Sequence, residues 1–171
     1  MLLREALAQI AGIQWTGDPG TTMSGIAYDS RTVRTGDLFV AIKGEKADGA
    51  RFIFQAVEKG AVAIASEQTI DPIPCVATLL VSDARRFLAE ISRVFYENPS
   101  SRLKLVGITG TKGKTTTSYL MNSIFRRAAY RSCLAGTIEM KIGDQSFHSS
   151  HTTPESSDLM ALFSQALAAG C

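Results

Sequence analysis

The chain has 171 residues, of which 45% are hydrophobic, 20% charged and 8% aromatic. This composition is typical of a folded globular protein and excludes the intrinsically disordered, collagen-like and disulfide-rich classes. The 18 Lys and Arg residues exceed the 16 Asp and Glu residues by only two, which predicts no broad nucleic-acid-binding surface.

Cysteine usage and hydropathy indicate the compartment. Cys75, Cys133 and Cys171 are far apart in the sequence and form no C-x-x-C pair, so we expect reduced thiols. No stretch approaches the roughly 18 consecutive apolar residues that a membrane span requires, and polar residues within positions 1–11 leave no signal-peptide core. The sequence therefore predicts a cytoplasmic protein.

The first hundred residues alternate between helical and strand-like patterns. Apolar residues at helical spacing predict a helix that ends at Gly12, a second over residues 50–59 that ends at Gly60, and a third that starts at Ser82 or Asp83. Short apolar runs predict strands at residues 26–28, 37–42, 61–65 and 75–81. This βαβ-like order is typical of an α/β fold.

Residues 97–101 carry Asn and Pro and break the third helix, so we place a domain boundary near residue 100. The second part is predicted to start with a strand at 103–109 and a helix at 115–129, whose inward face carries Leu120, Ile124 and Ala128. A strand at 132–135, a polar loop around 143–144 and a helix from about 155 to 169 follow.

Residues 107–117 read GITGTKGKTTT and lie between the predicted strand and helix. Gly110 and Gly113 let backbone N–H groups converge, and the helix N-terminus adds partial positive charge, so the segment predicts a polyphosphate cradle. Lys114 would reach the β- and γ-phosphates, and the Thr115 hydroxyl would ligate Mg²⁺. The strict pattern G-x-x-x-x-G-K-[ST] is not met, because position 108 is Ile.

Two alternatives stay open for this loop. The segment would be a plain Gly-rich turn if the Lys114 ammonium group were only solvated. Lys112 would be a surface lysine that contributes only its backbone N–H to the cradle, rather than a direct phosphate ligand.

The run from Thr109 to Thr115 resembles the T-G-T-N-G-K-[TS] loop of the Mur ligases, the ATP-dependent amide-forming enzymes of peptidoglycan synthesis, with Lys112 in place of the usual Asn. The resemblance implies ATP and Mg²⁺ as cofactors. It also implies catalytic roles for Lys114 and Thr115, with Thr115 as the Mg²⁺ ligand. The ATP-binding residues it implies are Gly110, Thr111, Lys112, Gly113, Lys114, Thr115 and Thr116.

Residues 29–31, which read D-S-R, and residues 36–41, which read G-D-L-F-V-A, resemble the N-terminal domain of Mur ligases that holds the uridine diphosphate end of the substrate. A strand end followed by a loop with a serine offers a hydroxyl and backbone groups for a uracil or ribose. The residues alone fit an Asx-type turn with a surface arginine equally well. The substrate-binding residues that the resemblance implies here are Tyr28, Ser30, Glu45, Lys46 and Ala47.

Residues 136–138, which read G-T-I, and residues 151–155, which read H-T-T-P-E, resemble a signature of the Mur ligases that add a diamino acid. The resemblance implies that Thr152 and Thr153 bind the muramoyl-dipeptide part of the substrate and that His151 lies beside it. The alternative is the start of a helix, with Thr153 as its cap and Pro154 at its first position.

The resemblance implies an α/β chain in which residues 1–100 form the uridine-binding N-terminal domain. Residues 101–171 would then form the truncated start of the P-loop central domain. Later family segments, including an acidic Mg²⁺ ligand, a carbamylated lysine and a C-terminal domain, are missing, so we expect the 171-residue chain alone to be inactive.

The intact enzyme is expected to join meso-diaminopimelate or L-lysine to UDP-N-acetylmuramoyl-L-alanyl-D-glutamate through an acyl phosphate. Three alternatives stay open: a Mur ligase that adds D-Ala-D-Ala, a non-catalytic fragment that only binds the uridine nucleotide sugar, and an unrelated P-loop kinase or GTPase.

Overall fold

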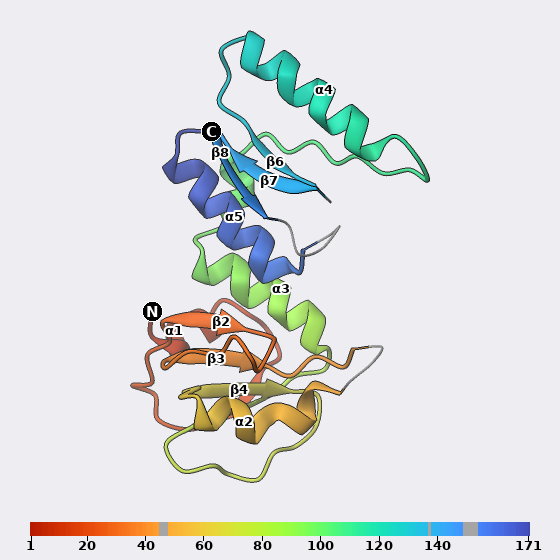
Figure 1. Ribbon diagram of the computed structural model, residues 1–171. Helices are drawn as coiled ribbons and strands as arrows, with labels where there is room; N and C mark the ends of the chain where they lie inside the picture. The colour runs from red at the N-terminus through yellow and green to blue at the C-terminus, as the bar shows by residue number, and fades with distance from the viewer. Residues whose placement is uncertain (45–47, 137, 149–153) are drawn as a thin grey trace. The chain divides into compact units, whose positions relative to one another are not determined.

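The computed structural model describes residues 1–44, 48–136, 138–148 and 154–171. The chain divides into two compact units, Met1–Phe95 and Tyr96–Cys171 (Figure 1). The first unit is an α/β sandwich built around a mainly parallel sheet, and the second combines helices with a small antiparallel sheet.

A five-stranded sheet organises the first unit, in the order β1-β5-β4-β3-β2. Strands β2 to β5 are parallel, and β1 runs antiparallel to β5 at one edge. The predicted strands are confirmed within a few residues, whereas β1 was not predicted, because its polar ends at Gln14 and Thr16 are exposed and give no apolar run. The strands are β1 (Gln14–Thr16), β2 (Gly25–Ala27), β3 (Asp37–Val40), β4 (Ala63–Ser66) and β5 (Ala77–Leu80).

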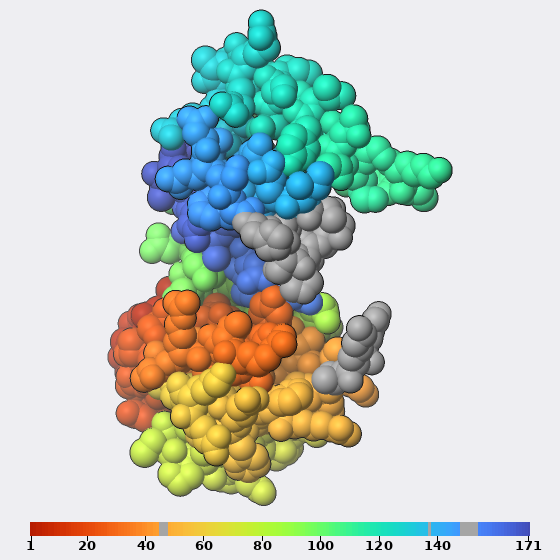
Figure 2. All heavy atoms as spheres, viewed as in Figure 1, coloured from red at the N-terminus to blue at the C-terminus, as the bar shows by residue number. Residues whose placement is uncertain are grey.

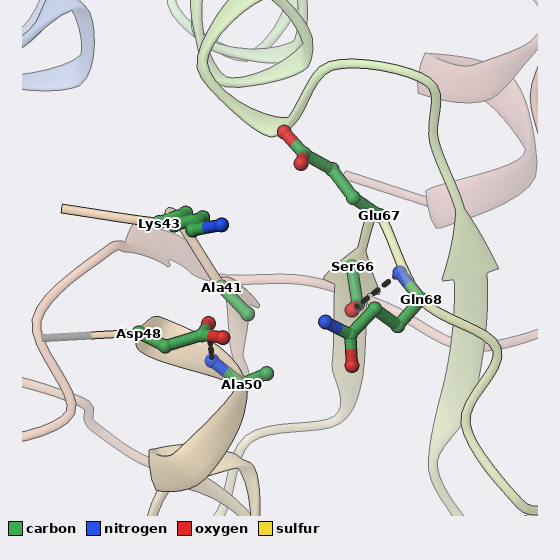
Figure 3. Close-up of a pocket in the computed structure, with 7 residues that line it drawn as sticks. All are labelled: Ala41, Lys43, Asp48, Ala50, Ser66, Glu67 and Gln68. Atoms are coloured by element: carbon green, nitrogen blue, oxygen red, sulfur yellow. Dashed lines mark hydrogen bonds between the residues drawn. The ribbon is translucent and has the colours of Figure 1, made fainter.

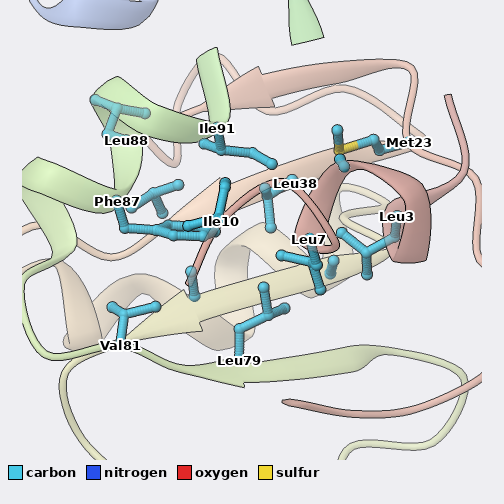
Figure 4. Packing of buried hydrophobic residues seen from close by; sticks show 14 of the residues in the cluster. Leu3, Leu7, Ile10, Met23, Leu38, Leu79, Val81, Phe87, Leu88 and Ile91 are labelled. Atoms are coloured by element: carbon cyan, nitrogen blue, oxygen red, sulfur yellow. The ribbon is translucent and has the colours of Figure 1, made fainter. Parts of the chain in front are cut away.

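Both faces of this sheet are covered, which explains why β3 and β4 are buried along their whole length. On one face, Leu38 and Val40 pack in a cluster with α1 (Leu3–Leu7) and α3 (Ala84–Phe95) (Figure 4). On the other face, Phe39 packs against the 3₁₀ turn η1 (Gly49–Phe52) and α2 (Ile53–Glu58). The alternation of neighbouring side chains between the two clusters follows from the strand period of two.

Gly60 ends α2 with a backbone φ of +94°, and a Cβ atom at this position would lie 2.8 Å from the Thr35 hydroxyl oxygen. Gly12 also has a positive φ, of +75°, but open space surrounds it. We expect Gly60→Ala to lower the free energy of unfolding by more than about 2 kcal/mol and Gly12→Ala by about 1 kcal/mol, since only the first adds a clash to the strain. Urea unfolding followed by Trp15 fluorescence measures both, and equal losses would contradict this account.

The second unit is smaller and has a sparse core. Its sheet is antiparallel, in the order β6-β7-β8, and Ile142 packs against Leu162 and Ala166 of the last helix. The elements are η2 (Pro99–Arg102), α4 (Lys114–Arg127), β6 (Cys133–Ala135), β7 (Glu139–Ile142), β8 (Gln145–His148) and α5 (Ser156–Ala168). The predicted strand at 132–135 and the predicted last helix are confirmed as β6 and α5.

Two expectations for this unit are wrong. Residues 103–109 form no strand, because no described strand lies beside them to share hydrogen bonds. The expected polar loop at 143–144 is confirmed as the two-residue turn of the β7–β8 hairpin, in which Gly143 adopts a φ of +56°, but the two strands of this hairpin were not predicted. The βαβ rhythm does not continue here either, since the sheet is antiparallel.

The orientation of α4 also differs from the expectation. Leu120 and Ile124, predicted to face inward, are 61% and 64% exposed, and none of the described side chains of α4 is buried (Figure 2). The helix contacts the rest of the unit through polar side chains on another face, at positions 119, 122 and 126. Spacings of three and four residues place these positions on one stripe of the helix.

Candidate functional site

The Gly-rich loop lies directly before α4, as predicted. Gly113 is the N-cap residue, in a left-handed conformation with a φ of +80°, and it offers no side chain to cap the helix. Gly110 has a φ of +153°, a second backbone conformation in this loop that a residue with a side chain rarely adopts. The loop thus presents exposed backbone at the positive end of a 14-residue helix, which is the arrangement that favours anions.

Lys114 folds back over this loop. Its Nζ donates a hydrogen bond of 2.6 Å to the Gly110 carbonyl oxygen. The ammonium group therefore lies against the backbone of the loop, where it adds positive charge beside the helix N-terminus. Thr115 is half-buried on the first turn of α4, Thr111 and Thr116 are exposed, and Lys112 is exposed in the loop.

The loop after β2 is an Asx turn, which confirms the structural alternative for residues 29–31. The Arg31 backbone N–H donates to the Asp29 Oδ1 atom at 2.9 Å, and the Arg31 guanidinium lies 2.6 Å from Asp29 Oδ2. Hydrogen bonding by Arg31 holds the pKa of Asp29 below its usual value. The Arg31 side chain is 83% exposed, so this ion pair adds little to stability.

Ser30, in contrast, is buried, with 6% of its surface exposed. Its hydroxyl donates a hydrogen bond of 2.7 Å to the Gln55 Oε1 atom on α2, which leaves the hydroxyl oxygen as an acceptor. Tyr28 packs against the cluster on the α1 and α3 face. The predicted residues Glu45, Lys46 and Ala47 lie outside the described residues.

A small open pocket lies where β3 and β4 end (Figure 3). Lys43 and Gln68 extend from opposite sides of this pocket in Figure 3, and the Ser66 hydroxyl accepts a hydrogen bond of 3.0 Å from the Gln68 backbone N–H. Its lining residues are Ala41, Lys43, Asp48, Ala50, Ser66, Glu67 and Gln68. Sequence reasoning missed Lys43, Ser66 and Gln68, although ligands of parallel sheets gather at the carboxyl ends of strands, and these residues end or follow predicted strands.

The predicted residues His151, Thr152 and Thr153 lie outside the described residues. The helix that follows begins at Ser156, with Glu155 as the N-cap residue in an extended conformation. Pro154 therefore precedes the helix rather than occupying its first position, because the extended backbone of Glu155 delays the helix start.

A polar network joins α4 to the hairpin. The Tyr119 hydroxyl donates to the Glu139 carboxylate, which also accepts a hydrogen bond from Lys141 Nζ at 2.9 Å. The Lys141 ammonium lies 5.3 Å from the centre of the Tyr119 ring. Hydrogen bonds from Tyr119, Lys141 and Ser146 lower the pKa of Glu139 to about 2. The same bond to Glu139 raises the pKa of Tyr119.

We expect the Glu139 carboxyl to titrate near pH 2, far below its ordinary value of 4.5. Because the pKa in the folded state is lowered, the stability that this network adds is fully present above pH 4.5 and is lost as the pH falls to about 2. Carbon-13 NMR of labelled glutamate would report the midpoint. In Tyr119→Phe the midpoint should rise toward the ordinary range, and an unchanged midpoint would contradict this assignment.

No helix in the part of the chain that the structure describes is long and apolar enough to cross a membrane.

Comparisons with known proteins match both units. The family model described as the Mur ligase family, catalytic domain, matches residues 22–96, and the Mur ligase middle domain matches residues 108–171. The UDP-N-acetylmuramoyl-L-alanyl-D-glutamate--2,6-diaminopimelate ligase of Caldanaerobacter subterraneus subsp. tengcongensis is 45% identical over 148 residues, which cover 86% of this chain and 31% of that protein. The chain spans about a third of the length of the curated relatives it matches.

Solved structures of ligases are also similar to this chain. A structure of a UDP-N-acetylmuramoyl-L-alanyl-D-glutamate--2,6-diaminopimelate ligase matches with a TM-score of 0.70 and 25% identity over 91% of this chain and 32% of that chain. A crystal structure of MurF from Acinetobacter baumannii matches with a TM-score of 0.63 and 27% identity, over 94% of this chain and 32% of that chain.

Proposed function

We propose, since this chain belongs to the Mur ligase family, that it supplies the uridine-nucleotide-binding and phosphate-binding parts of an ATP-dependent ligase of the MurE branch. The observation that carries this proposal is the Gly-rich loop at the uncapped start of α4, with Lys114 folded across it. Met1–Phe95 would correspond to the N-terminal domain and Tyr96–Cys171 to the start of the middle domain.

The loop fits a nucleoside triphosphate with Mg²⁺. Gly110 and Gly113 hold positive φ angles that a side chain would strain, so the backbone N–H groups stay open to phosphate oxygens. Residues 110–116 would hold ATP, and the half-buried Thr115 would ligate Mg²⁺. When bound, ATP supplies the phosphoryl group that makes the D-glutamate carboxylate of the substrate reactive toward an amine.

Lys114 would leave the Gly110 carbonyl and place its charge on the triphosphate, where it stabilises the negative charge of the transferred group. The energetic cost of this move is small, because the bond it replaces is exposed to water and phosphate offers a stronger, charge-assisted partner. Lys112 contributes its backbone N–H to the same cradle.

The carboxyl ends of β2, β3 and β4 would bind the uridine nucleotide. The Ser30 hydroxyl oxygen can still accept a hydrogen bond while Gln55 fixes its orientation, and Lys43 offers a cation in the lining of the pocket. We propose Tyr28, Ser30, Glu45, Lys46 and Ala47 as contacts there, and His151, Thr152 and Thr153 as contacts to the muramoyl dipeptide. The proposed substrates are UDP-N-acetylmuramoyl-L-alanyl-D-glutamate and a diamino acid, with diaminopimelate favoured over L-lysine by the names of the relatives. A cytoplasmic location accords with these substrates.

A D-Ala-D-Ala-adding ligase is less supported, because the curated relatives at 36–45% identity are named as diaminopimelate ligases.

The test has two steps. First, titration calorimetry on the 171-residue chain should show binding of UDP-N-acetylmuramoyl-L-alanyl-D-glutamate and of Mg-ADP, with no phosphate release when ATP is added. Second, the coding DNA is read past codon 171, and any longer product is assayed by product mass with diaminopimelate, L-lysine or D-Ala-D-Ala. Absence of uridine-nucleotide binding, or a D-Ala-D-Ala product, would overturn the proposal.

A further inference from the structure

Three side-chain hydrogen bonds join α4 to the rest of its unit. The Tyr119 hydroxyl donates to Glu139, Ser132 donates to Asn122 Oδ1 at 2.7 Å, and Arg126 donates to Asp144 at 2.8 Å. None of the described side chains of α4 is buried, and Met121 and Phe125 are only half-buried, so these bonds contribute much of what holds the helix on the hairpin. The phosphate loop continues directly into this helix, so the same bonds set the position of the loop.

Of the three bonds, the one at Tyr119 is the strongest and the nearest to the loop. Its acceptor is a carboxylate that is 23% exposed, whereas both partners of the Arg126–Asp144 pair are more than half exposed. A hydrogen bond to a charged group is worth more than a neutral one, and an exposed ion pair is worth little. Lys141 and Ser146 also donate to Glu139, so these two residues hold its carboxylate in place independently of Tyr119.

Glu139 occupies a particular place in the hairpin. It is the first residue of β7, and it pairs with His148, the last residue of β8. The Glu139 side chain therefore links the helix that follows the phosphate loop to the end of the hairpin formed by Glu139 and His148.

We propose that Glu139 is a positioning residue for the phosphate loop, holding the first two turns of α4 through Tyr119 against the end of the β7–β8 hairpin at which Glu139 pairs with His148. The inference rests on the proposed function only in taking this loop to be the nucleotide site. Glu139 itself touches no reacting group.

Amide hydrogen exchange on the 171-residue chain, without ligand, tests the link. Tyr119→Phe and Glu139→Ala should each speed exchange at residues 117–121 at least about fivefold, and the double variant should be no faster than either, since the two side chains act as one unit. Glu139→Gln keeps an acceptor for Tyr119 and should recover part of the protection. Arg126→Gln, on the same stripe but far from the loop, should leave these amides unchanged.

The affinity for Mg-ADP provides the second measurement. In Tyr119→Phe this affinity should fall by a factor similar to the increase in the exchange rate, and in Arg126→Gln it should not fall. Exchange rates at residues 117–121 that match the wild type in Tyr119→Phe would overturn the positioning role, even if Glu139→Ala fails to fold. A wild-type chain that binds no Mg-ADP would instead overturn the proposed nucleotide site, while the exchange measurement still decides the link between Tyr119 and Glu139.

Discussion

Replacing Lys114 with alanine is expected to lower the rate of ligation by the complete ligase about 10²–10³-fold, the usual cost of losing one group that stabilises developing charge. The Lys114 ammonium group already lies against the loop proposed to hold the triphosphate, where it donates a hydrogen bond to the Gly110 carbonyl oxygen. Affinity for the uridine substrate should stay within about twofold, because the residues proposed to bind uridine belong to the other unit. Steady-state kinetics and calorimetry with the uridine nucleotide separate the two effects.

Lys112→Ala is the matched control, since it removes an equal charge from the same loop, two residues before Lys114. It should slow ligation by less than about tenfold, because only its backbone N–H is assigned to the cradle. A Lys114→Ala enzyme that turns over at the wild-type rate would remove the loop from the mechanism, whatever its effect on stability.

Phe39→Ala is expected to lower the free energy of unfolding of the first unit by about 3–5 kcal/mol. Phe39 is 1% exposed on β3, between neighbouring strands and beneath α2, so its loss leaves a cavity that the sheet cannot close. Trp15, the only tryptophan of the chain, packs against the first unit, so its fluorescence in urea follows this unit alone.

The same substitution at Phe54 gives the control. Phe54 lies on α2 and is 73% exposed, so Phe54→Ala should change the free energy of unfolding by no more than about 0.5 kcal/mol. Equal losses at the two phenylalanines would mean that burial does not determine the stability of this unit.

The first unit was largely predictable because its central strands β3 and β4 are buried on both faces and therefore form continuous apolar runs in the sequence. Gly60 ends α2 with a positive φ angle, as its position in the sequence indicated, whereas the first helix ends at Leu7 rather than at Gly12 as predicted. The edge strand β1 escaped prediction because burial there is one-sided and short.

The second unit was less predictable, since the apolar pattern of α4 describes a face that meets no partner among the described residues. Leu120 and Ile124 follow the helical period, yet the contacts run through Tyr119 and Arg126. Polar stripes carry no hydropathy signal, so the network around Glu139 could not be found from the sequence. The Gly-rich loop was found, because glycines and a lysine before a helix leave few structural options.

The strand order of the first unit bears on how the chain is made. The sheet uses only residues 14–80, but its first strand, β1, pairs with its last strand, β5. The backbone groups of β1 therefore have no partner strand until about 65 further residues have been synthesised. During synthesis, the first unit can close and bury its two clusters before the phosphate loop has left the ribosome. The phosphate loop and α4 thus leave the ribosome after the first unit has folded. Apolar side chains of the first unit are by then buried and do not form competing contacts with α4.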